Sequence, residues 1–95
     1  MFLAIAHYTV ADGNESAVLA LVAELESASR AEPGCLAFDA YLKVGSARRV
    51  VLIERYRSEA DFALHRETEH FARLVLAQIV PLLEERSVES WELPD

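Results

Sequence analysis

Residues 2–10, FLAIAHYTV, form a stretch that is apolar on both faces when it is extended. Aromatic and β-branched residues favour a strand, and successive side chains of a strand point to opposite faces. One face then carries Leu3, Ile5, His7 and Thr9, and the other carries Phe2, Ala4, Ala6 and Tyr8. A strand of this kind needs cover on both sides. We therefore expect helices over one face of a sheet and a partner sheet against the other.

The segment after this strand predicts a surface helix with one buried face. Asn14 follows a turn-forming ADG sequence and is a residue type that caps helices. The apolar stripe has the i, i+3, i+4, i+7 spacing of a helix and consists of Val18, Leu21, Val22 and Leu25. Pro33 and Gly34 end the helix, because proline cannot continue it and glycine accepts the backbone conformations of a stop.

Two strands are predicted next, over CLAFDAYL at 35–42 and RRVVLIERYR at 48–57. The loop between them is short and contains Gly45 and Ser46, so the strands should pair antiparallel. Alternation in the second strand places Val50, Leu52, Glu54 and Tyr56 on a common face. Cys35, at the start of the first, is expected to be a small buried residue, because it lacks the electropositive setting of a nucleophilic thiol.

Two helix start signals follow these strands. Ser58 begins the capping pattern SEAD and opens a short helix that carries Phe62 and His65. Thr68 can cap a second helix, whose apolar residues are Phe71, Leu74, Val75, Ile79 and Leu82. The tail RSVESWEL, at 86–93, alternates as a final short strand. The order strand, helix, strand, strand, helix, strand predicts a ferredoxin-like α+β domain with an antiparallel sheet over residues 1–95.

Charge and hydropathy exclude several classes of partner. The net charge is −7 and the nine Lys and Arg are scattered, so neither nucleic acid nor an anionic membrane surface is an expected partner. The run from Leu74 to Leu83 is far shorter than the roughly 20 residues of a membrane span. No secretory signal is visible, and a single cysteine fits a reducing compartment, so we expect a cytoplasmic protein. A chain of 95 residues buries little surface, which favours a homodimer.

Three stretches resemble the antibiotic biosynthesis monooxygenase domain. They are EPGCLAFDAY at 32–41, VVLIERYRSEADFALH at 50–65 and TEHF at 68–71. The resemblance implies a ferredoxin-like fold that dimerises into an α+β barrel. Members of that family include cofactor-independent oxygenases of quinols and polyphenolic metabolites, haem-degrading enzymes, an isomerase of a phosphorylated signalling sugar, and many proteins without a known reaction.

The resemblance separates these branches residue by residue. The haem-degrading branch places Asn, Trp and an iron-binding His at positions that correspond here to His7, His65 and Val75, so it does not imply haem degradation. The quinol-oxygenase and isomerase branches carry one His at the end of the short helix and another just after a Thr-Pro pair. His65 and His70 match both, although Glu69 stands in place of Pro. Both residue types suit the first turn of a helix.

The three histidines are therefore the candidate catalytic residues. His65 follows Phe62 by three positions and is expected to face inward, with His7 of the first strand beneath it in one cavity. His70 is expected in a first helical turn, where the positive end of the helix dipole disfavours imidazolium and leaves a neutral base. The structural alternatives are packed or exposed histidines without a catalytic role. The candidate substrate-binding residues are Glu54, Tyr41, Tyr56, Phe62 and Phe71.

Neither a metal nor a cofactor is predicted. The chain has no HExxH motif and no nucleophile elbow. The leading hypothesis is a cofactor-independent monooxygenase that oxidises a small aromatic or quinol-type substrate with O2, with His65 as base or anchor and His70 and His7 assisting. One alternative is an isomerase of a hydroxyketone phosphate, for which cationic residues would have to converge, chosen from Lys43, Arg48, Arg49 and Arg66. Another is a non-catalytic, ligand-binding dimer. The identity of the substrate stays open.

Overall fold

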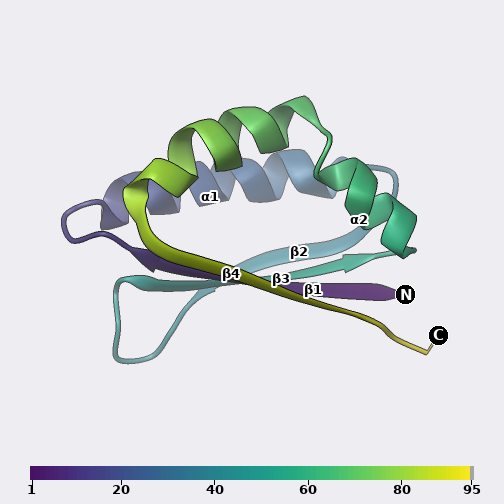
Figure 1. Ribbon diagram of the computed structural model, residues 1–95, viewed down its shortest axis with the longest axis horizontal. Helices are drawn as coiled ribbons and strands as arrows, with labels where there is room; N and C mark the ends of the chain where they lie inside the picture. The colour runs from purple at the N-terminus through teal and green to yellow at the C-terminus, as the bar shows by residue number, and fades with distance from the viewer. Residues whose placement is uncertain (95) are drawn as a thin grey trace.

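The computed structural model describes residues 1–94, and these residues form a four-stranded antiparallel sheet with helices over one face (Figure 1). The strands are β1 (Phe2–Val10), β2 (Cys35–Leu42), β3 (Arg49–Tyr56) and β4 (Leu83–Glu92). Their order across the sheet is β2-β3-β1-β4. The first strand of the chain, β1, and the last, β4, therefore lie side by side. The ferredoxin-like α+β fold predicted from the sequence is confirmed.

The helical layer consists of α1 (Glu15–Arg30), α2 (Glu59–His65), η1 (Phe71–Ile79) and η2 (Val80–Leu82). The sequence predicts one helix from Thr68 to Leu82, but η1 is wound as a π-helix and η2 as a 3-10 helix. The amide of Val80 accordingly donates to the carbonyl of Val75, five residues earlier. Pro81 has no amide hydrogen, so the regular pattern of an α-helix cannot continue through it.

The two faces of β1 have different surroundings. Phe2, Ala4, Ala6, Tyr8 and Val10 are buried beneath the helices, and the residues between them are only half-buried. The sequence predicted cover on both faces of β1, and within the single chain the helices cover only one of them. The partner sheet that would cover the other face stays a prediction.

The main core lies between the inner face of the sheet and the helices α1 and η1. Its buried side chains include Val22 and Leu25 of α1, Leu52 of β3, and Leu74 and Ile79 of η1. Burial of each such side chain stabilises the fold by about 1.5–3 kcal/mol. A second cluster, Phe2, Ala4 and Tyr56 with Phe62 and Cys35 against it, lies beneath α2. This second cluster anchors the helix that carries His65.

The start of α2 is fixed by short polar contacts. The hydroxyl of Ser58 accepts a hydrogen bond of 3.2 Å from the amide of Asp61, and Arg57 donates to both Asp61 carboxylate oxygens at 3.0 and 3.3 Å. A Cβ atom on Gly34 would lie 2.3 Å from Asp61 Cγ. The absence of a side chain at residue 34 therefore lets α2 pack directly on the turn that follows α1.

β4 is the edge strand next to β1, and its residues are exposed along almost its whole length. Arg86, Val88 and Ser90 pair with Tyr8, Ala6 and Ala4, so their side chains lie on the inner side of the sheet. The helices do not cover this side of β4 completely. The space that remains is the cavity described below. Within residues 1–94, no helix has both the length and the apolar character that a membrane span requires.

Candidate active site

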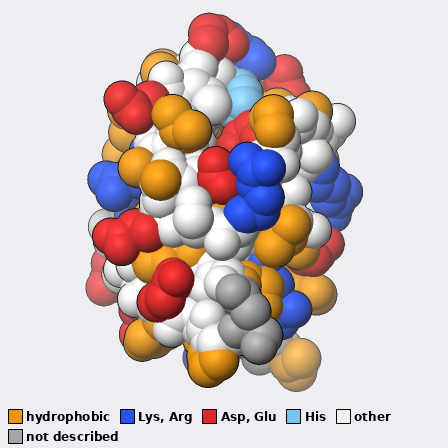
Figure 2. Space-filling model, turned by 90° about the vertical axis from the view of Figure 1, so that its right-hand side faces the viewer, with side chains coloured by type: hydrophobic (Ala, Val, Ile, Leu, Met, Phe, Trp, Pro, Cys, Tyr) orange, Lys and Arg blue, Asp and Glu red, His pale blue; other side chains and the backbone are white. Residues whose placement is uncertain are grey.

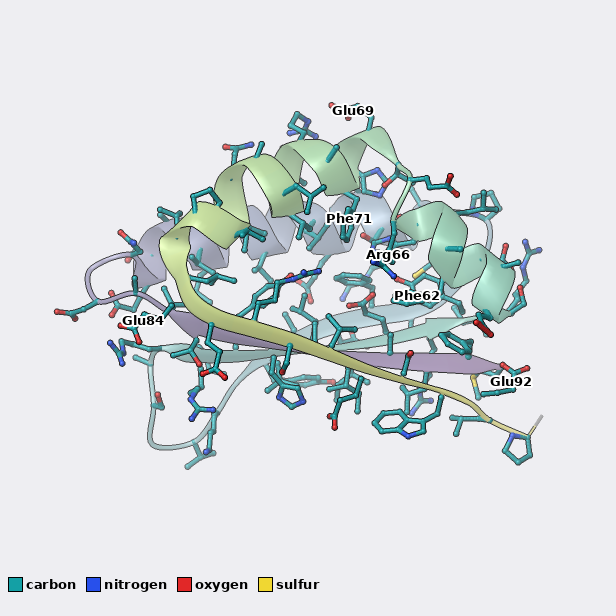
Figure 3. The ribbon with its side chains drawn as sticks, in the orientation of Figure 1. Phe62, Arg66, Glu69, Phe71, Glu84 and Glu92 are labelled. Atoms are coloured by element: carbon teal, nitrogen blue, oxygen red, sulfur yellow. The ribbon has the colours of Figure 1, made fainter. Side chains whose placement is uncertain are left out.

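A cavity of about 350 Å³ lies between the inner side of the sheet and the place where α2 meets η1. This volume suits a small ligand. Figure 3 shows Phe62, Arg66 and Phe71 at that end of the helical layer. The aromatic residues of the lining are Tyr8, Phe38, Phe62 and Phe71, and its ionisable side chains include Glu54, His65, Arg66 and Arg86. Two serines, Ser87 and Ser90, add further polar groups, so the wall is part aromatic and part polar.

His65 is the last residue of α2, and its ring lies between two carboxylates. Its Nδ1 lies 2.8 Å from Oε2 of Glu32, in the turn after α1, and its Nε2 lies 3.7 Å from Oε1 of Glu54, on β3. Because an ionised carboxylate only accepts hydrogen bonds, the neutral ring donates from Nδ1 to Glu32 and keeps its lone pair on Nε2. Burial lowers the pKa of His65, and the hydrogen bond and charge of Glu32 oppose that change.

Aromatic rings surround His65 and fix the orientation of its imidazole ring. The ring centroids of Phe71, Tyr56 and Phe38 lie 5.3, 5.4 and 5.6 Å from that of His65, and Phe62 stacks on it at 6.3 Å. The side chain of His65 is only 2% exposed. The ring is thus a buried, oriented imidazole that lines the cavity.

Glu54 supplies a second proton-binding group in the cavity. Burial raises its pKa to about 7, and a hydrogen bond from Tyr56 opposes the rise. The Tyr56 hydroxyl donates to Oε1 of Glu54 at 2.6 Å. Near neutral pH the carboxyl group can therefore hold or release a proton close to Nε2 of His65.

His70 meets His65 on one carboxylate oxygen. Its Nε2 lies 2.6 Å from Oε2 of Glu32, the same oxygen that His65 contacts, and its side chain is 18% exposed. Thr68 makes the turn between the two histidines. Its hydroxyl donates to the carbonyl of His65 at 2.8 Å and accepts from the amide of Phe71 at 3.2 Å. The predicted helix restart at Thr68 is confirmed, and it brings the two histidines together.

The predicted position of His7 beneath His65 is wrong. His7 lies on the face of β1 that no helix covers, and its Nε2 contacts Oε2 of Glu89 at 3.2 Å. The helices cover the face that carries Ala6 and Tyr8, and adjacent strand residues point to opposite faces. His7 therefore cannot share the cavity of His65.

Tyr41, predicted to line the cavity, also lies outside it. It is 55% exposed and pairs with Val51 on the outer side of the sheet, whereas Phe38 of the same strand points inward and is buried. The other predicted substrate-binding residues lie at the site. Glu54, Phe62 and Phe71 line the cavity, and Tyr56 supports Glu54 from beneath.

Glu32 is a site residue that sequence reasoning missed. In the sequence it is the residue before Pro33 and Gly34, where only the end of a helix is visible. Its partners lie 33 and 38 residues later in the chain. Such a contact depends on the packing of α2 against the turn after α1, and no local pattern reports it.

Glu32, His65 and His70 also form a set that could hold a metal ion, since each offers one ligand atom and these atoms lie within 4.8 Å of one another. As placed, the atoms bond to each other, with N to O distances of 2.8 and 2.6 Å. Ligand atoms around a zinc ion, each about 2.0–2.2 Å from it, stand wider apart than this. Binding a metal would require the two hydrogen bonds to open.

The cationic cluster that an isomerase of a phosphate ester would need does not form from the residues predicted for it. Arg48 pairs with Glu84 at 3.3 Å, and Lys43 and Arg49 line a separate hollow beside His7. Arg66 alone of the four lines the cavity of His65. Arg86, which the sequence did not single out, joins it there.

The sequence profile of the family described as "Antibiotic biosynthesis monooxygenase" matches residues 1–76, which include Glu32, Glu54, His65 and His70. The chain belongs to this family. A curated relative, "Putative monooxygenase YcnE" of Bacillus subtilis (strain 168), is 40% identical over 47 residues, and the match spans half of this chain and half of that protein. Both printed names are those of monooxygenases.

Solved structures agree over the whole length. A crystal structure titled as an antibiotic biosynthesis monooxygenase has a TM-score of 0.92 and 30% identity, with all of both chains covered. Rv0793 from Mycobacterium tuberculosis has a TM-score of 0.91 and 30% identity, covering 99% of this chain and 95% of its own. The family and fold implied by the resemblance of the sequence are confirmed.

Proposed function

We propose that the protein is a cofactor-independent monooxygenase that oxidises a small aromatic, quinol-type substrate with O2. The observation that carries the proposal is the buried His65, which Glu32 holds at Nδ1 and whose Nε2 lies 3.7 Å from Glu54, with both His65 and Glu54 lining the cavity. Family membership and the names of the relatives support the monooxygenase class.

The first step is removal of a phenolic proton. Nε2 of His65 accepts it, and the negative charge of Glu32 stabilises the imidazolium that forms. A substrate ring packed against Phe38, Phe62 and Phe71 would shield its phenolate from water on that side, which would make it a better electron donor to O2. The residues thus supply a base and a shaped site, and the substrate supplies the electrons.

The reaction balances without a further reductant. An electron passes from the deprotonated quinol to O2, and the two radicals combine to form a C–O bond at a ring carbon. The O–O bond then breaks as that carbon loses its hydrogen, one oxygen atom stays on the ring as a carbonyl, and the other leaves as water. The substrate gives four electrons and becomes a hydroxyquinone, and O2 accepts all four.

His65 and Glu54 also transfer protons to the leaving oxygen. His65 returns its proton to form water, and the second water hydrogen comes from the ring carbon by way of Glu54, whose pKa of about 7 suits both directions. The contact from His65 through Glu32 to the partly exposed His70 gives the buried ring a route for proton exchange with solvent. His7 and Tyr41 have no role in this scheme.

The predicted homodimer belongs to the same proposal. The uncovered face of the sheet carries the apolar side chains of Leu3, Ile5 and Ile53, all half-buried, and Trp91, which is 44% exposed. A second copy that packs its own sheet against this face would complete the cover that β1 needs on both sides. Light scattering tests this, since a monomer at micromolar concentration contradicts it. The cytoplasmic location stays a prediction from the single cysteine.

Oxygen uptake tests the activity. Purified protein in metal-free buffer should consume O2 with at least one member of a panel of quinols. His65→Gln keeps a hydrogen-bonding group but loses the base, so turnover should fall about 10²–10⁴-fold. Glu24→Gln, on the exposed side of α1, is the control for altered surface charge and should behave as wild type. The absence of uptake across the panel, or full activity of His65→Gln, contradicts the proposal and favours a non-catalytic dimer.

A further inference from the structure

Arg66 and Arg86 stand together at the cavity of His65. Both line the cavity, and both also line a second hollow beside it, together with Glu67, Phe71 and Leu76. Arg66 follows α2 directly, and Arg86 lies on the inner side of β4, opposite Tyr8. Figure 2 views the molecule from the end at which α2 lies and shows basic side chains there among hydrophobic and acidic ones. Two guanidinium groups therefore flank the approach to the buried histidine.

Neither arginine has an ion-pair partner within residues 1–94, although the charge of Arg86 acts on the carboxyl group of Glu54 in the same cavity. Ion pairs within residues 1–94 hold Arg30, Arg48, Arg57 and Arg73. Arg66 and Arg86 form no ion pair with any residue of that range, although the chain has 16 acidic residues and a net charge of −7. The guanidinium of Arg66 lies instead over the ring of Phe62, 5.7 Å from its centroid. An acidic protein thus keeps two arginines without an ion pair beside a cavity.

The surroundings also orient these cations. Burial raises the pKa of Tyr8 to about 12, so its hydroxyl stays protonated, and the charge of Arg86 acts on that hydroxyl from close by. Arg66 is held by its contact with Phe62, which is itself packed beneath α2. Guanidinium groups match the geometry of carboxylate and phosphate oxygens by paired hydrogen bonds.

We propose that Arg66 and Arg86 bind an oxyanionic group of the substrate, a carboxylate or a phosphate, while the hydroxylated end of the substrate lies against His65. The proposal rests on the function proposed above for that hydroxylated end and adds the chemistry of the opposite end. An anion held at the arginines would orient the molecule, so that its hydroxyl group meets Nε2 of His65 and not the wall of the cavity. The substrate class is then an acidic phenol or quinol, and not a neutral one.

Binding measurements with compounds that are not quinols test this without turnover. The probes are 3-hydroxybenzoate, 3-hydroxyphenyl phosphate and the uncharged 3-hydroxybenzyl alcohol, titrated by calorimetry at low salt. At least one anion should bind roughly tenfold or more tightly than the alcohol, which corresponds to about 1.4 kcal/mol. Arg66→Gln and Arg86→Gln should each reduce this preference and the double variant should abolish it. Arg73→Gln, an arginine held in ion pairs on η1, should retain it.

The anion that binds more tightly identifies the group, and either result supports the subsite. Equal binding of the alcohol and both anions by wild type, or a preference that survives in the double variant, overturns it. If a glutamine variant does not fold by circular dichroism, the lysine variants replace it, because they keep the charge and should keep part of the preference.

Oxygen uptake separates this proposal from the function on which it rests. An anion preference without uptake of O2 by any quinol removes the oxygenase and leaves the subsite. Uptake of O2 with neutral quinols, together with equal binding of all probes, removes the subsite and leaves the oxygenase.

Discussion

His65 and Glu32 form a hydrogen bond of 2.8 Å that joins the end of α2 to the turn after α1, across 33 residues of sequence. The bond fixes which ring nitrogen of His65 carries the hydrogen and leaves Nε2 beside Glu54. A carboxylate in this place orients a base and stabilises its charged form, and it need not touch the substrate. We regard Glu32 as a positioning residue, since it does not line the cavity.

Glu32→Gln should therefore lower kcat by about 10–10³-fold, with little change in KM, because an amide cannot stabilise the imidazolium. Glu32 raises the pKa of His65, in opposition to burial. The acidic limb of the profile of kcat/KM against pH should consequently move to lower pH in the variant. Glu24→Gln, with the same change on the exposed side of α1, should leave kcat and the profile as in wild type. A variant with unchanged kcat and an unshifted profile would show that Glu32 only supports the fold.

Glu54 should make the protein less stable as pH rises. Burial raises its pKa from 4.5 to about 7, so between these values the folded state holds more protons than the unfolded state. The free energy of unfolding should then fall as pH rises from 4.5 to 7, by up to roughly 3 kcal/mol. Glu54→Gln should remove this slope. Tyr56, Glu32, Arg86 and His65 surround the group and remain in the variant.

The measurement is denaturant unfolding of wild type and Glu54→Gln from pH 4.5 to 8. The lowered pKa of His65 acts in the opposite sense, because it reduces the free energy of unfolding as pH falls below 6.5. This effect is present in both proteins. The difference between their free energies of unfolding at each pH therefore isolates the contribution of Glu54. Glu69→Gln, an exposed change on the helical layer, is the control. Parallel curves for wild type and Glu54→Gln contradict the prediction.

Zinc should inhibit the proposed reaction. The ligand atoms of Glu32, His65 and His70 are near enough to one another to bind one ion together. Binding the ion would break the hydrogen bonds that position His65. Treatment with EDTA should leave the rate of O2 uptake unchanged, and added Zn²⁺ should lower it. His70→Asn should weaken inhibition by zinc, because one of the three ligands is lost. A rate that disappears with EDTA and returns with a metal would mean a metal-dependent enzyme.

Gly34→Ala should destabilise the protein and disturb the site. The added Cβ would lie 2.3 to 2.6 Å from the Cγ, Cβ and Oδ1 atoms of Asp61, which Arg57 and Ser58 hold in place. Displacing α2 would cost roughly 1–3 kcal/mol and move His65 away from Glu32. Thermal unfolding and O2 uptake measure the two effects. The cost should shrink in an Asp61→Gly background, and an equal cost in both backgrounds would place the strain elsewhere.

The sequence predicted the elements whose signals are local. The apolar alternation of 2–10, the stripe of Val18, Leu21, Val22 and Leu25, and the cap at Thr68 each report their own segment, and together they define the order of the fold. His65 was placed inward because it shares a helical stripe with Phe62. These inferences needed only periodicity and residue type.

The features that sequence reasoning missed depend on packing between segments. Both faces of β1 are apolar, so nothing in its pattern indicated that the helices would cover Ala6 and Tyr8 and leave His7 on the other side. The role of Glu32 depends on the approach of α2 to the turn after α1, which Gly34 permits. Arg86 joins Arg66 only because β4 pairs with β1 in a register that turns residue 86 inward.

The position of β4 in the chain separates two tasks. The groups proposed to handle protons, Glu32, Glu54, His65 and His70, all lie within the 1–76 range matched by the family profile, and the strand Leu83–Glu92 comes after it. Its backbone holds it to β1 whichever side chains it carries, since the hydrogen bonds of a sheet are made by main-chain groups. New residues at 86, 88 and 90 would remodel the wall that meets the ligand. Alternate positions of one edge strand are thus where the wall of the cavity could change while Glu32, Glu54, His65 and His70 stay in place.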